Sequence, residues 1–156
     1  MFQFKIKAFK DLSVDELYAI LQLRETVFVV EQNCVYHDID NIDQACYHLF
    51  SVDQITEKII AYTRLVPANI KFDVPARGRL ISDKSYRGKG LGRALMVKSI
   101  EETCRIFNTD VIKISAQTYL LNFYSSLGFK PISETYDEDG IEHVDMVLEE
   151  LLNCEL

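Results

Sequence analysis

Hydrophobic and polar residues alternate near the start of the chain and then change to helical spacing. Residues 2–8 carry apolar side chains at every second position, which is the pattern of a half-buried strand. Ser13 and Glu16 match a capping box, in which the two side chains satisfy unpaired backbone donors, so a helix is predicted to begin there. Apolar residues at helical spacing continue to Phe28, and Arg24 interrupts this stripe.

The rest of the chain predicts strands that alternate with helices and end in a hairpin. Further strands are predicted at residues 46–52, 58–66, 77–82, 111–116, 132–136 and 142–148. Two helices are predicted among them, a long one with a buried stripe at Val97, Ile100, Cys104 and Phe107, and a short one over 119–127 that ends at Gly128. We therefore predict an α/β fold, with one mixed α+β sheet and helices on both its faces, in a single domain spanning residues 1–156.

Composition narrows the class of protein. The chain has 156 residues, a net charge of −7 and a sequence pI of about 4.9, which argues against a nucleic-acid-binding protein, because such a protein needs a basic face. No apolar run approaches the roughly 18 residues of a membrane span, and the first residues do not resemble a signal peptide. The four cysteines lack CxxC or zinc spacing and are predicted to be reduced thiols. We expect a cytoplasmic monomer or homodimer that binds neither nucleic acid nor membrane.

A glycine-rich loop between the strand at 77–82 and the long helix is the strongest candidate for a binding site. Its glycines, Gly88, Gly90 and Gly92, allow backbone N–H groups to converge on an anion at a helix N-terminus. Residues 84–98 carry a charge of +5, against −12 for the remainder of the chain. A cationic segment on an acidic protein favours a small polyanionic ligand.

Two well-known phosphate-binding loops do not fit this segment. A P-loop needs a glycine where Asp83 stands and a serine or threonine where Gly90 stands. A dinucleotide fingerprint that begins at Gly88 would need a small residue in place of Arg93. We therefore predict another kind of anion site here, and the alternative is that the glycines only shape a tight turn from strand to helix.

The loop resembles the pyrophosphate loop of the GCN5-related N-acetyltransferases (GNAT), since Arg87, Gly90 and Gly92 stand in an Arg-x-x-Gly-x-Gly pattern. Tyr124 and the Gly-Phe pair that follows it resemble the Tyr-x-x-x-Gly-Phe element of the same family. Further segments are similar to the ElaA-like branch, at residues 24–32, Asp38/Asp40/Asp43, 115–117 and 138–143. The resemblance covers nearly the whole chain. It implies the GNAT acyl-CoA N-acyltransferase fold, a mostly antiparallel sheet flanked by helices, with acetyl-CoA as cofactor.

The same resemblance assigns residues to the cofactor site. The strand residues Leu80, Ile81 and Ser82 would bind the pantetheine arm and the thioester through their backbone. The pyrophosphate would be held by the loop residues Arg87, Gly88, Lys89, Gly90, Leu91, Gly92 and Arg93. Gln117, at a position where many members carry asparagine, and Asn122 would add contacts. Tyr124 falls where the family's general acid lies, so it would contact the cofactor and protonate the departing thiolate.

The acceptor side and the general base are predicted less directly. The implied reaction is direct attack of a primary amine, from a small molecule or a peptide, in a ternary complex. The protonated amine must first lose a proton, and the candidate bases are His48, His143, Glu31 and the three aspartates. His48 lies in an alternating strand, so a hydrogen-bonded core histidine is the alternative there. The candidate acceptor site consists of Arg24, Phe28, Asp40, Asp43 and His143.

Acidic residues dominate two segments, residues 25–57 and 131–156, which contain no lysine or arginine. Some of these carboxylates are expected to attract a cationic amine, and the alternative is a solvated acidic surface. No metal is predicted, because Asp38, Asp40 and Asp43 lack the EF-hand spacing and the histidines fit no zinc pattern.

Two other functions stay open. Leu23, Arg24, Val27 and Phe28, followed by spaced aspartates, also resemble acyl-homoserine-lactone synthases, although this chain lacks tryptophan. A non-catalytic CoA-binding sensor or interaction module is the other alternative. Cys34 and Cys46 lie in the expected acceptor region and leave a covalent acyl-enzyme route open.

Overall fold

A computed structural model describes residues 2–149, which form one open sheet flanked by helices. Seven strands lie side by side in the order β1 (Gln3–Ala8), β2 (Tyr47–Val52), β3 (Ile59–Val66), β4 (Ala76–Ser82), β5 (Ile112–Gln117), β8 (Ile141–Leu148) and β6 (Lys130–Pro131), and β7 (Tyr136–Glu138) also pairs with β8. All these pairs are antiparallel except β4 with β5. The prediction of a mostly antiparallel mixed sheet is confirmed.

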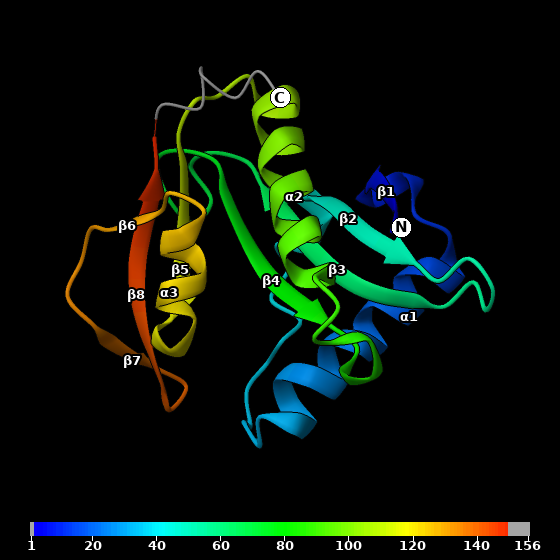
Figure 1. Ribbon diagram of the computed structural model, residues 1–156. Coiled ribbons are helices and arrows are strands. Elements are labelled where there is room, and N and C mark those ends of the chain that lie inside the picture. Colours follow the sequence, from blue (N-terminus) through cyan, green and yellow to red (C-terminus); the bar gives the residue numbers. More distant parts are fainter. Residues whose placement is uncertain (1, 150–156) are drawn as a thin grey trace.

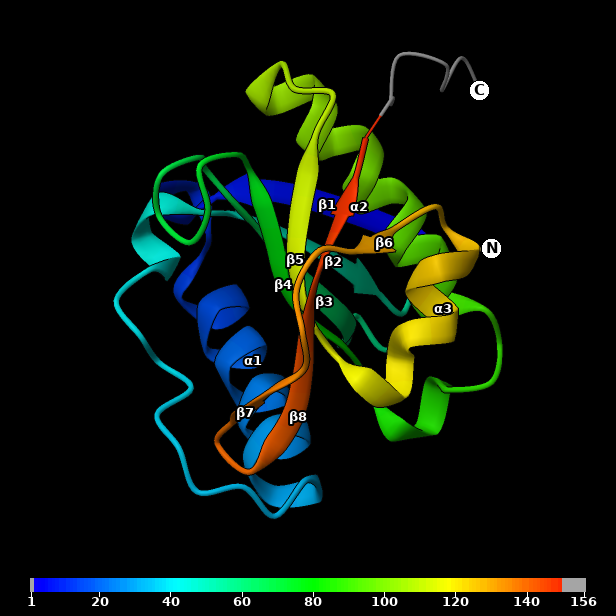
Figure 2. The same ribbon diagram turned by 90° about the vertical axis from the view of Figure 1, so that its left-hand side faces the viewer.

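Helices cover both faces of the sheet, as Figure 2 shows, with α1 (Val14–Arg24) on one side and α2 (Leu91–Phe107) and α3 (Leu121–Ser126) on the other. The capping box that starts α1 is formed in both directions between Ser13 and Glu16. After Arg24 the helix continues as a π-helical segment, Glu25–Glu31, a form often found near functional sites. Short 3-10 helices occur at Phe9–Asp11, Asp43–Ala45, Lys84–Tyr86 and Thr118–Leu120.

The core consists of separate apolar layers on the two faces. Beneath α1, Ile20 and Leu23 pack with side chains of β2, β3 and β4. On the opposite face, Leu91 and Leu95 of α2 pack against β2 and β3. Because successive strand residues point to opposite faces, β3 contributes to both layers, and all eight of its residues are buried.

The parallel strands β4 and β5 touch at one end only. A single register pair joins them, Ala76 with Lys113, supported by a hydrogen bond from the Lys113 N–H to the Pro75 carbonyl at 3.1 Å. Beyond this pair the strands diverge, as Figure 1 shows, so the remaining residues of β4 face a gap in the sheet. The backbone groups along this gap are not used by a neighbouring strand, which leaves them to bind an extended ligand.

The last hairpin differs from its predicted position. The predicted strand at 132–136 is replaced by the two-residue β6 and by β7, which begins only at Tyr136. The hairpin turns at Asp139 and Gly140, which have φ angles of 53° and 81°. Two consecutive positive φ angles define a tight two-residue turn, and this turn sets the register of β7 against β8.

Candidate active site

The glycine loop presents unpaired backbone donors at the start of α2. Gly88 and Gly90 have φ angles of 80° and 78°, in the left-handed region that favours glycine. Gly90 is the N-cap of α2, and no side chain caps the first turn. The helix therefore keeps its N-terminal N–H groups and its positive dipole end for an anion.

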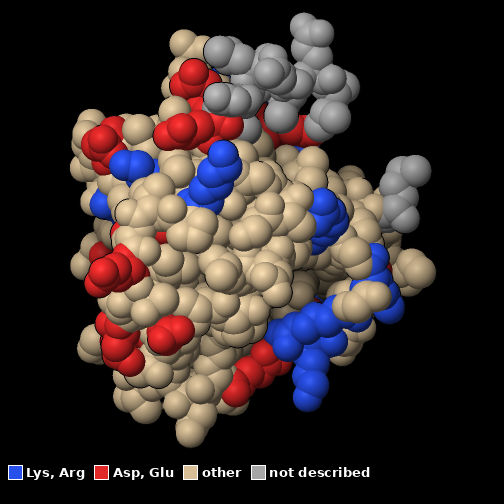
Figure 3. Space-filling view, turned by 60° about the vertical axis from the view of Figure 1, so that its left-hand side comes forward, with Lys and Arg blue, Asp and Glu red and all other residues tan. Residues whose placement is uncertain are grey.

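Cationic side chains surround the loop, as the sequence predicted. Arg87, Lys89 and Arg93 are exposed, whereas the side chain of Leu91 is buried beneath α2, so Leu91 can offer a ligand only its backbone. Arg93 donates a hydrogen bond to Ser126 of α3 at 2.9 Å, which ties the first turn of α2 to the helix that carries Tyr124. Figure 3 shows basic side chains gathered beside a hollow in the surface.

Arg87 links the loop to β4 and to the end of the π-helical segment. Its guanidinium donates to the Ser82 carbonyl at 2.9 Å and forms an ion pair with Glu31 at 2.7 Å. Glu31 was predicted as a candidate base, but the structure places it against the cation of the cofactor loop. This ion pair directs the Glu31 carboxylate at Arg87, and no hydrogen bond or ion pair links it to Tyr124 or to β4 among the described residues.

The strand β4 contains a bulge at the edge of the gap. Tyr62 of β3 pairs with Ile81, but Arg64 pairs with Gly78, so β4 has one extra residue between these pairs. Arg79 lies in this bulge with a φ angle of 56°. A bulge leaves backbone groups outside the ladder, and here it does so next to the predicted thioester-binding residues.

Tyr124 projects from α3 into a buried environment next to an unexpected arginine. Its ring is 6% exposed and packs edge-on against Phe129, with ring centroids 5.9 Å apart. Arg77 of β4 is 4% exposed and donates to Thr63 at 3.2 Å, but its Nε and Nη2 atoms have no hydrogen-bond partner among the described residues. Burial lowers the pKa of Arg77, and the charge of Tyr124 acts in the opposite direction.

Sequence reasoning missed Arg77, which reads as an ordinary strand residue. The available signal was an arginine at the start of a predicted strand, between the small residues Ala76 and Gly78. Arg77 on β4 and Tyr124 on α3 are both buried, and the two groups interact electrostatically.

Gln117 and His143 lie opposite one another at the open end of the gap. They are register partners on β5 and β8, and Gln117 also contacts Gln32 at 3.3 Å, just beyond the π-helical segment. His143 Nδ1 lies 2.7 Å from the Ile141 carbonyl, which can only accept, so Nδ1 carries the ring N–H. Nε2 is 3.6 Å from a carboxylate oxygen of Glu138, and His143 is 8% exposed. Asn122 is exposed on α3.

His48 is a core histidine, and the structure gives it no access to a substrate. It is 0% exposed, and its two ring nitrogens lie 2.7 Å from the Tyr62 hydroxyl and 2.9 Å from the Asp43 carbonyl. Burial lowers the pKa of His48, so the ring is neutral at pH 7. The prediction of His48 as base is corrected, because neither nitrogen is available.

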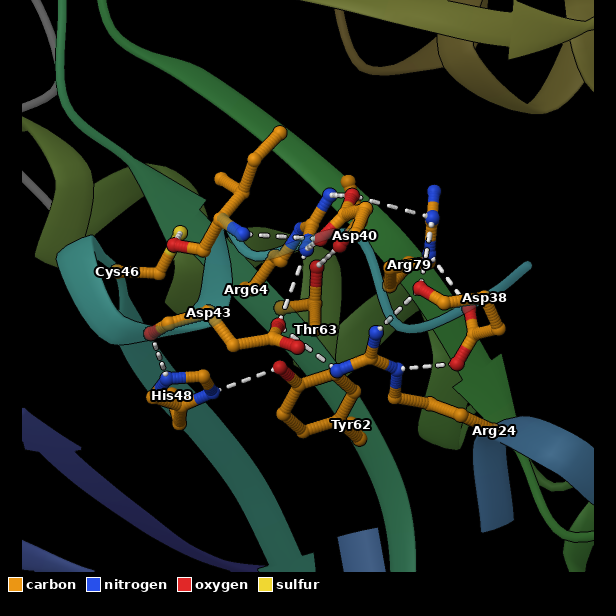
Figure 4. A network of polar contacts seen from close by, with 12 residues as sticks. Arg24, Asp38, Asp40, Asp43, Cys46, His48, Tyr62, Thr63, Arg64 and Arg79 are labelled. Atoms are coloured by element: carbon orange, nitrogen blue, oxygen red, sulfur yellow. Dashed lines mark hydrogen bonds and ion pairs between the residues drawn. The ribbon is translucent and has the colours of Figure 1, made fainter. Parts of the chain in front are cut away.

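The aspartates of the predicted acceptor site are bound by arginines of the same chain. As Figure 4 shows, three aspartates and three arginines form one network, with members Arg24, Asp38, Asp40, Asp43, Arg64 and Arg79. Arg24 and Asp43 are 0% and 5% exposed and pair with one another, so the structure gives no support to the prediction that they bind substrate.

Asp40 and Phe28 also take part in this arrangement. Burial alone would raise the pKa of Asp40, but the hydrogen bond and charge of Arg64, helped by Arg79, lower it well below its usual value. Arg79 lies over the Phe28 ring, 5.8 Å from its centroid. The acidic stretch thus serves mainly to neutralise buried arginines, and the expected attraction of a cationic amine by Asp40 loses its basis.

The cysteines near this region are buried thiols. Cys46 is 2% exposed, its Sγ donates to the Ile42 carbonyl at 3.3 Å, and burial raises its pKa to about 11. Cys34 is 7% exposed and donates to the Asp139 carbonyl at 3.2 Å. A thiol of high pKa that cannot reach solvent is a poor nucleophile. Cys154 lies outside the described residues.

A separate groove of about 960 Å³ lies between α1 and the strands β1 to β3, and none of the predicted site residues lines it. Within residues 2–149, no helix is long and apolar enough to cross a membrane, and no group of three or more histidine, cysteine, aspartate or glutamate side chains is arranged to hold a metal ion.

A divergent parallel strand pair beside a glycine loop at a helix N-terminus defines the class of acyl-CoA-dependent N-acyltransferase folds. Comparison with known proteins supports the same class. The family model described as acetyltransferase (GNAT) domain matches residues 11–150. The ElaA protein of Escherichia coli is 40% identical over 139 residues, which cover 89% of this chain and 91% of that protein. The chain belongs to the GNAT family, in its ElaA-like branch.

Solved structures show the same relationship. The crystal structure of Escherichia coli ElaA has a TM-score of 0.88, with 37% identity over 96% of this chain and 100% of that chain. An acyl-CoA N-acyltransferase from Pseudomonas aeruginosa has a TM-score of 0.89, with 35% identity over 95% and 99%. A CoA-dependent acyl-homoserine lactone synthase, BjaI, shares only the fold, with a TM-score of 0.76 and 16% identity over 96% and 83%.

Proposed function

We propose that this protein transfers an acetyl group from acetyl-CoA to a primary amine of a small molecule or a peptide. The observation that carries the proposal is the single register pair between β4 and β5, beyond which the strands open beside the glycine loop and Tyr124. Acetyl-CoA supplies an activated thioester. The residues of this chain bind and orient it and protonate the thiolate that leaves.

Two sets of backbone groups are suited to hold the cofactor. The uncapped N-terminus of α2, with Arg87, Lys89 and Arg93 around it, matches a pyrophosphate in charge and in donor geometry. Along β4, the backbone from Leu80 to Ser82 faces the gap and is suited to bind the pantetheine arm as an added strand would be bound. Side chains of Gln117 and Asn122 would extend these contacts.

Charge that develops during amine attack needs stabilisation at two atoms. The thioester oxygen becomes an oxyanion, and a preorganised backbone N–H of β4 stabilises it, an interaction that is worth about 3 kcal/mol in other acyl-transfer sites. The sulfur leaves as a thiolate, and the Tyr124 hydroxyl donates a proton to it. Arg77, a buried cation next to the phenol, stabilises the phenolate that remains.

The base that we propose is His143. Its Nε2 accepts a proton from the ammonium group of the acceptor, and the free amine then attacks the thioester; the Glu138 carboxylate lies 3.6 Å from Nε2. Direct attack in a ternary complex is favoured over an acyl-enzyme, because Cys34 and Cys46 are both buried and donate to backbone carbonyls. We expect His143→Gln to lower kcat at least tenfold with little change in CoA affinity.

The test is thiol release from acetyl-CoA across a panel of primary amines that includes polyamines, lysine peptides and homoserine lactone. We expect Tyr124→Phe to lower kcat at least tenfold with little change in CoA affinity. His37→Gln, at an exposed histidine, serves as the control for His143→Gln. CoA binding without thiol release for any amine would favour a sensor, and lactone formation from longer acyl-CoA donors would favour the synthase.

A further inference from the structure

The bulge in β4 has a strained residue at its centre. Among the non-glycine residues with positive φ in the described part of the chain, Arg79 is the one that lies inside a strand. Asn33, Asn41, Glu57, Asn69, Asn108 and Asp139 lie in loops, turns and caps. A left-handed φ is unfavourable for a residue with a Cβ, so the surrounding structure must hold Arg79 in place.

The side chain of Arg79 is fixed by an unusual number of contacts. Its Nε donates to Asp38 Oδ1 at 2.7 Å, and its Nη2 donates to the Asp38 carbonyl at 3.2 Å and to Asp40 Oδ2 at 3.4 Å. The guanidinium also lies 5.8 Å from the centroid of the Phe28 ring and 5.9 Å from that of Tyr36. Together these contacts form a clamp on the Arg79 side chain, and this clamp holds the backbone of Arg79 in its strained conformation.

The two aspartates that hold Arg79 are themselves immobilised by arginines from other elements. Arg24 of α1 donates to Asp38 at 2.8 Å, and Arg64 of β3 donates to Asp40 at 2.6 Å. Asp43 accepts from both of these arginines and completes the network, as Figure 4 shows. The aspartates of the clamp are therefore held by buried arginines of α1 and of the neighbouring strand β3.

The bulge lies between the end of β4 that pairs with β5 and the predicted thioester-binding residues. It lies between Gly78 and Ile81, after the last contact of β4 with β5 and before the loop at the start of α2. On the other edge of β4, Thr63 donates to the Gly78 carbonyl at 2.8 Å and fixes the backbone just before Arg79. Backbone groups of the bulge lie outside the ladder with β3. A backbone N–H freed from a ladder is the kind of donor that stabilises a developing oxyanion.

We propose that Arg79 is a positioning residue for acyl transfer, and that its contacts with Asp38 and Asp40 hold the β4 bulge in the shape that presents its backbone N–H groups to the thioester. This proposal rests on the proposed function. It assigns the ion-pair network a role in catalytic geometry in addition to the neutralisation of buried charge. It also gives a reason for a residue with a Cβ at a backbone position that glycine would occupy without strain.

The decisive comparison is between Arg79→Ala and Arg79→Gly. Both remove the clamp, but alanine keeps the strain whereas glycine adopts a positive φ without it. Asp38 and Asp40 each keep a second arginine, so both variants are expected to fold, which urea unfolding checks. We expect Arg79→Ala to lose at least tenfold in kcat and Arg79→Gly to keep at least three times the kcat of Arg79→Ala.

If glycine acted only by making the strand more flexible, Arg79→Gly would have a lower kcat than Arg79→Ala. A kcat of Arg79→Gly that is equal to or lower than that of Arg79→Ala would therefore overturn the proposal. If the alanine variant does not fold, Arg79→Lys replaces it, because lysine keeps the charge but cannot form the same fork of hydrogen bonds.

A readout independent of turnover separates this proposal from the proposed function. The amide resonances of Leu80 and Ile81 should shift in Arg79→Ala and stay near their wild-type positions in Arg79→Gly. A wild-type protein without transfer activity would reject the function and leave this comparison valid. Unchanged amide resonances in Arg79→Ala would reject the clamp, whatever the activity.

Discussion

The ion-pair network makes a quantitative prediction at Asp43. Its Oδ1 accepts from Arg24 at 2.8 Å and from Arg64 at 3.0 Å, and the side chains of the three residues are 7%, 1% and 1% exposed, respectively. Asp43→Asn keeps the shape of the side chain and an acceptor oxygen but removes its charge. The two buried arginines then share the remaining aspartates, Asp38 and Asp40, with Arg79, and the network has one uncompensated positive charge.

Removal of one partner from a buried ion pair costs about 3–5 kcal/mol in other proteins. Because the total stability of a domain is about 5–15 kcal/mol, we expect Asp43→Asn to lose a large fraction of it. For a chain of this size, the loss corresponds to a Tm decrease of roughly 6–20 °C. The direction is fixed by burial, since solvent cannot screen charges at these side chains.

The assay is urea unfolding followed by circular dichroism, with the m-value compared between variants. Asp73→Asn is the matched control, since it removes the same charge from an ion pair with Lys113 in which the Asp73 side chain is 76% exposed. We expect this control to leave the midpoint unchanged. A loss below about 1 kcal/mol for Asp43→Asn, or an equal loss for the control, would refute the reasoning.

Three further predictions follow from single groups. Arg77→Met should stabilise the fold by about 1–2 kcal/mol, because it removes a buried guanidinium with two unpartnered nitrogens; a lower urea midpoint would contradict this. The lowered pKa of Asp40 means that its stabilising contribution is present above the pKa of the unfolded state and is lost as pH falls below about 4. The urea midpoint should therefore fall more steeply from pH 5 to pH 3 in the wild type than in Asp40→Asn, and parallel slopes would count against it. Gly90→Ala meets no atom within 4 Å but is strained by its φ of 78°, so calorimetry should show at least tenfold weaker CoA binding with the fold retained; an unchanged Kd would show that the loop conformation is dispensable.

Local features of this protein could be predicted from sequence because their determinants are neighbours in the chain. The capping box depends on Ser13 and Glu16 alone, and it formed as predicted. The glycine loop needs only short-range positive φ angles and a following helix, and it lies between β4 and α2 as expected. The sheet with helices on both faces followed from the alternation of strand and helix patterns.

The acceptor side could not be predicted in the same way, because its charges are paired across long sequence separations. Asp38 contacts Arg24, which is 14 residues away, and Arg79, which is 41 residues away. An acidic segment without lysine or arginine therefore looked unpaired. In the fold its aspartates pair with arginines of other elements, such as Arg64 of β3. Likewise, the alternating pattern around His48 identifies a strand but does not reveal that both ring nitrogens have structural partners.

The central claim is that the gap between β4 and β5, with the glycine loop, binds acyl-CoA. Thermal unfolding with and without acetyl-CoA and CoA tests it most directly, with ATP and NAD as controls. A ligand at 100 times its Kd adds about 2.7 kcal/mol, which raises the Tm by several degrees for a chain of this length. We predict that acetyl-CoA and CoA each raise the Tm and that ATP and NAD do not. An unchanged Tm for a folded protein would contradict the account, since the loop and the gap would then be structural features without a cofactor.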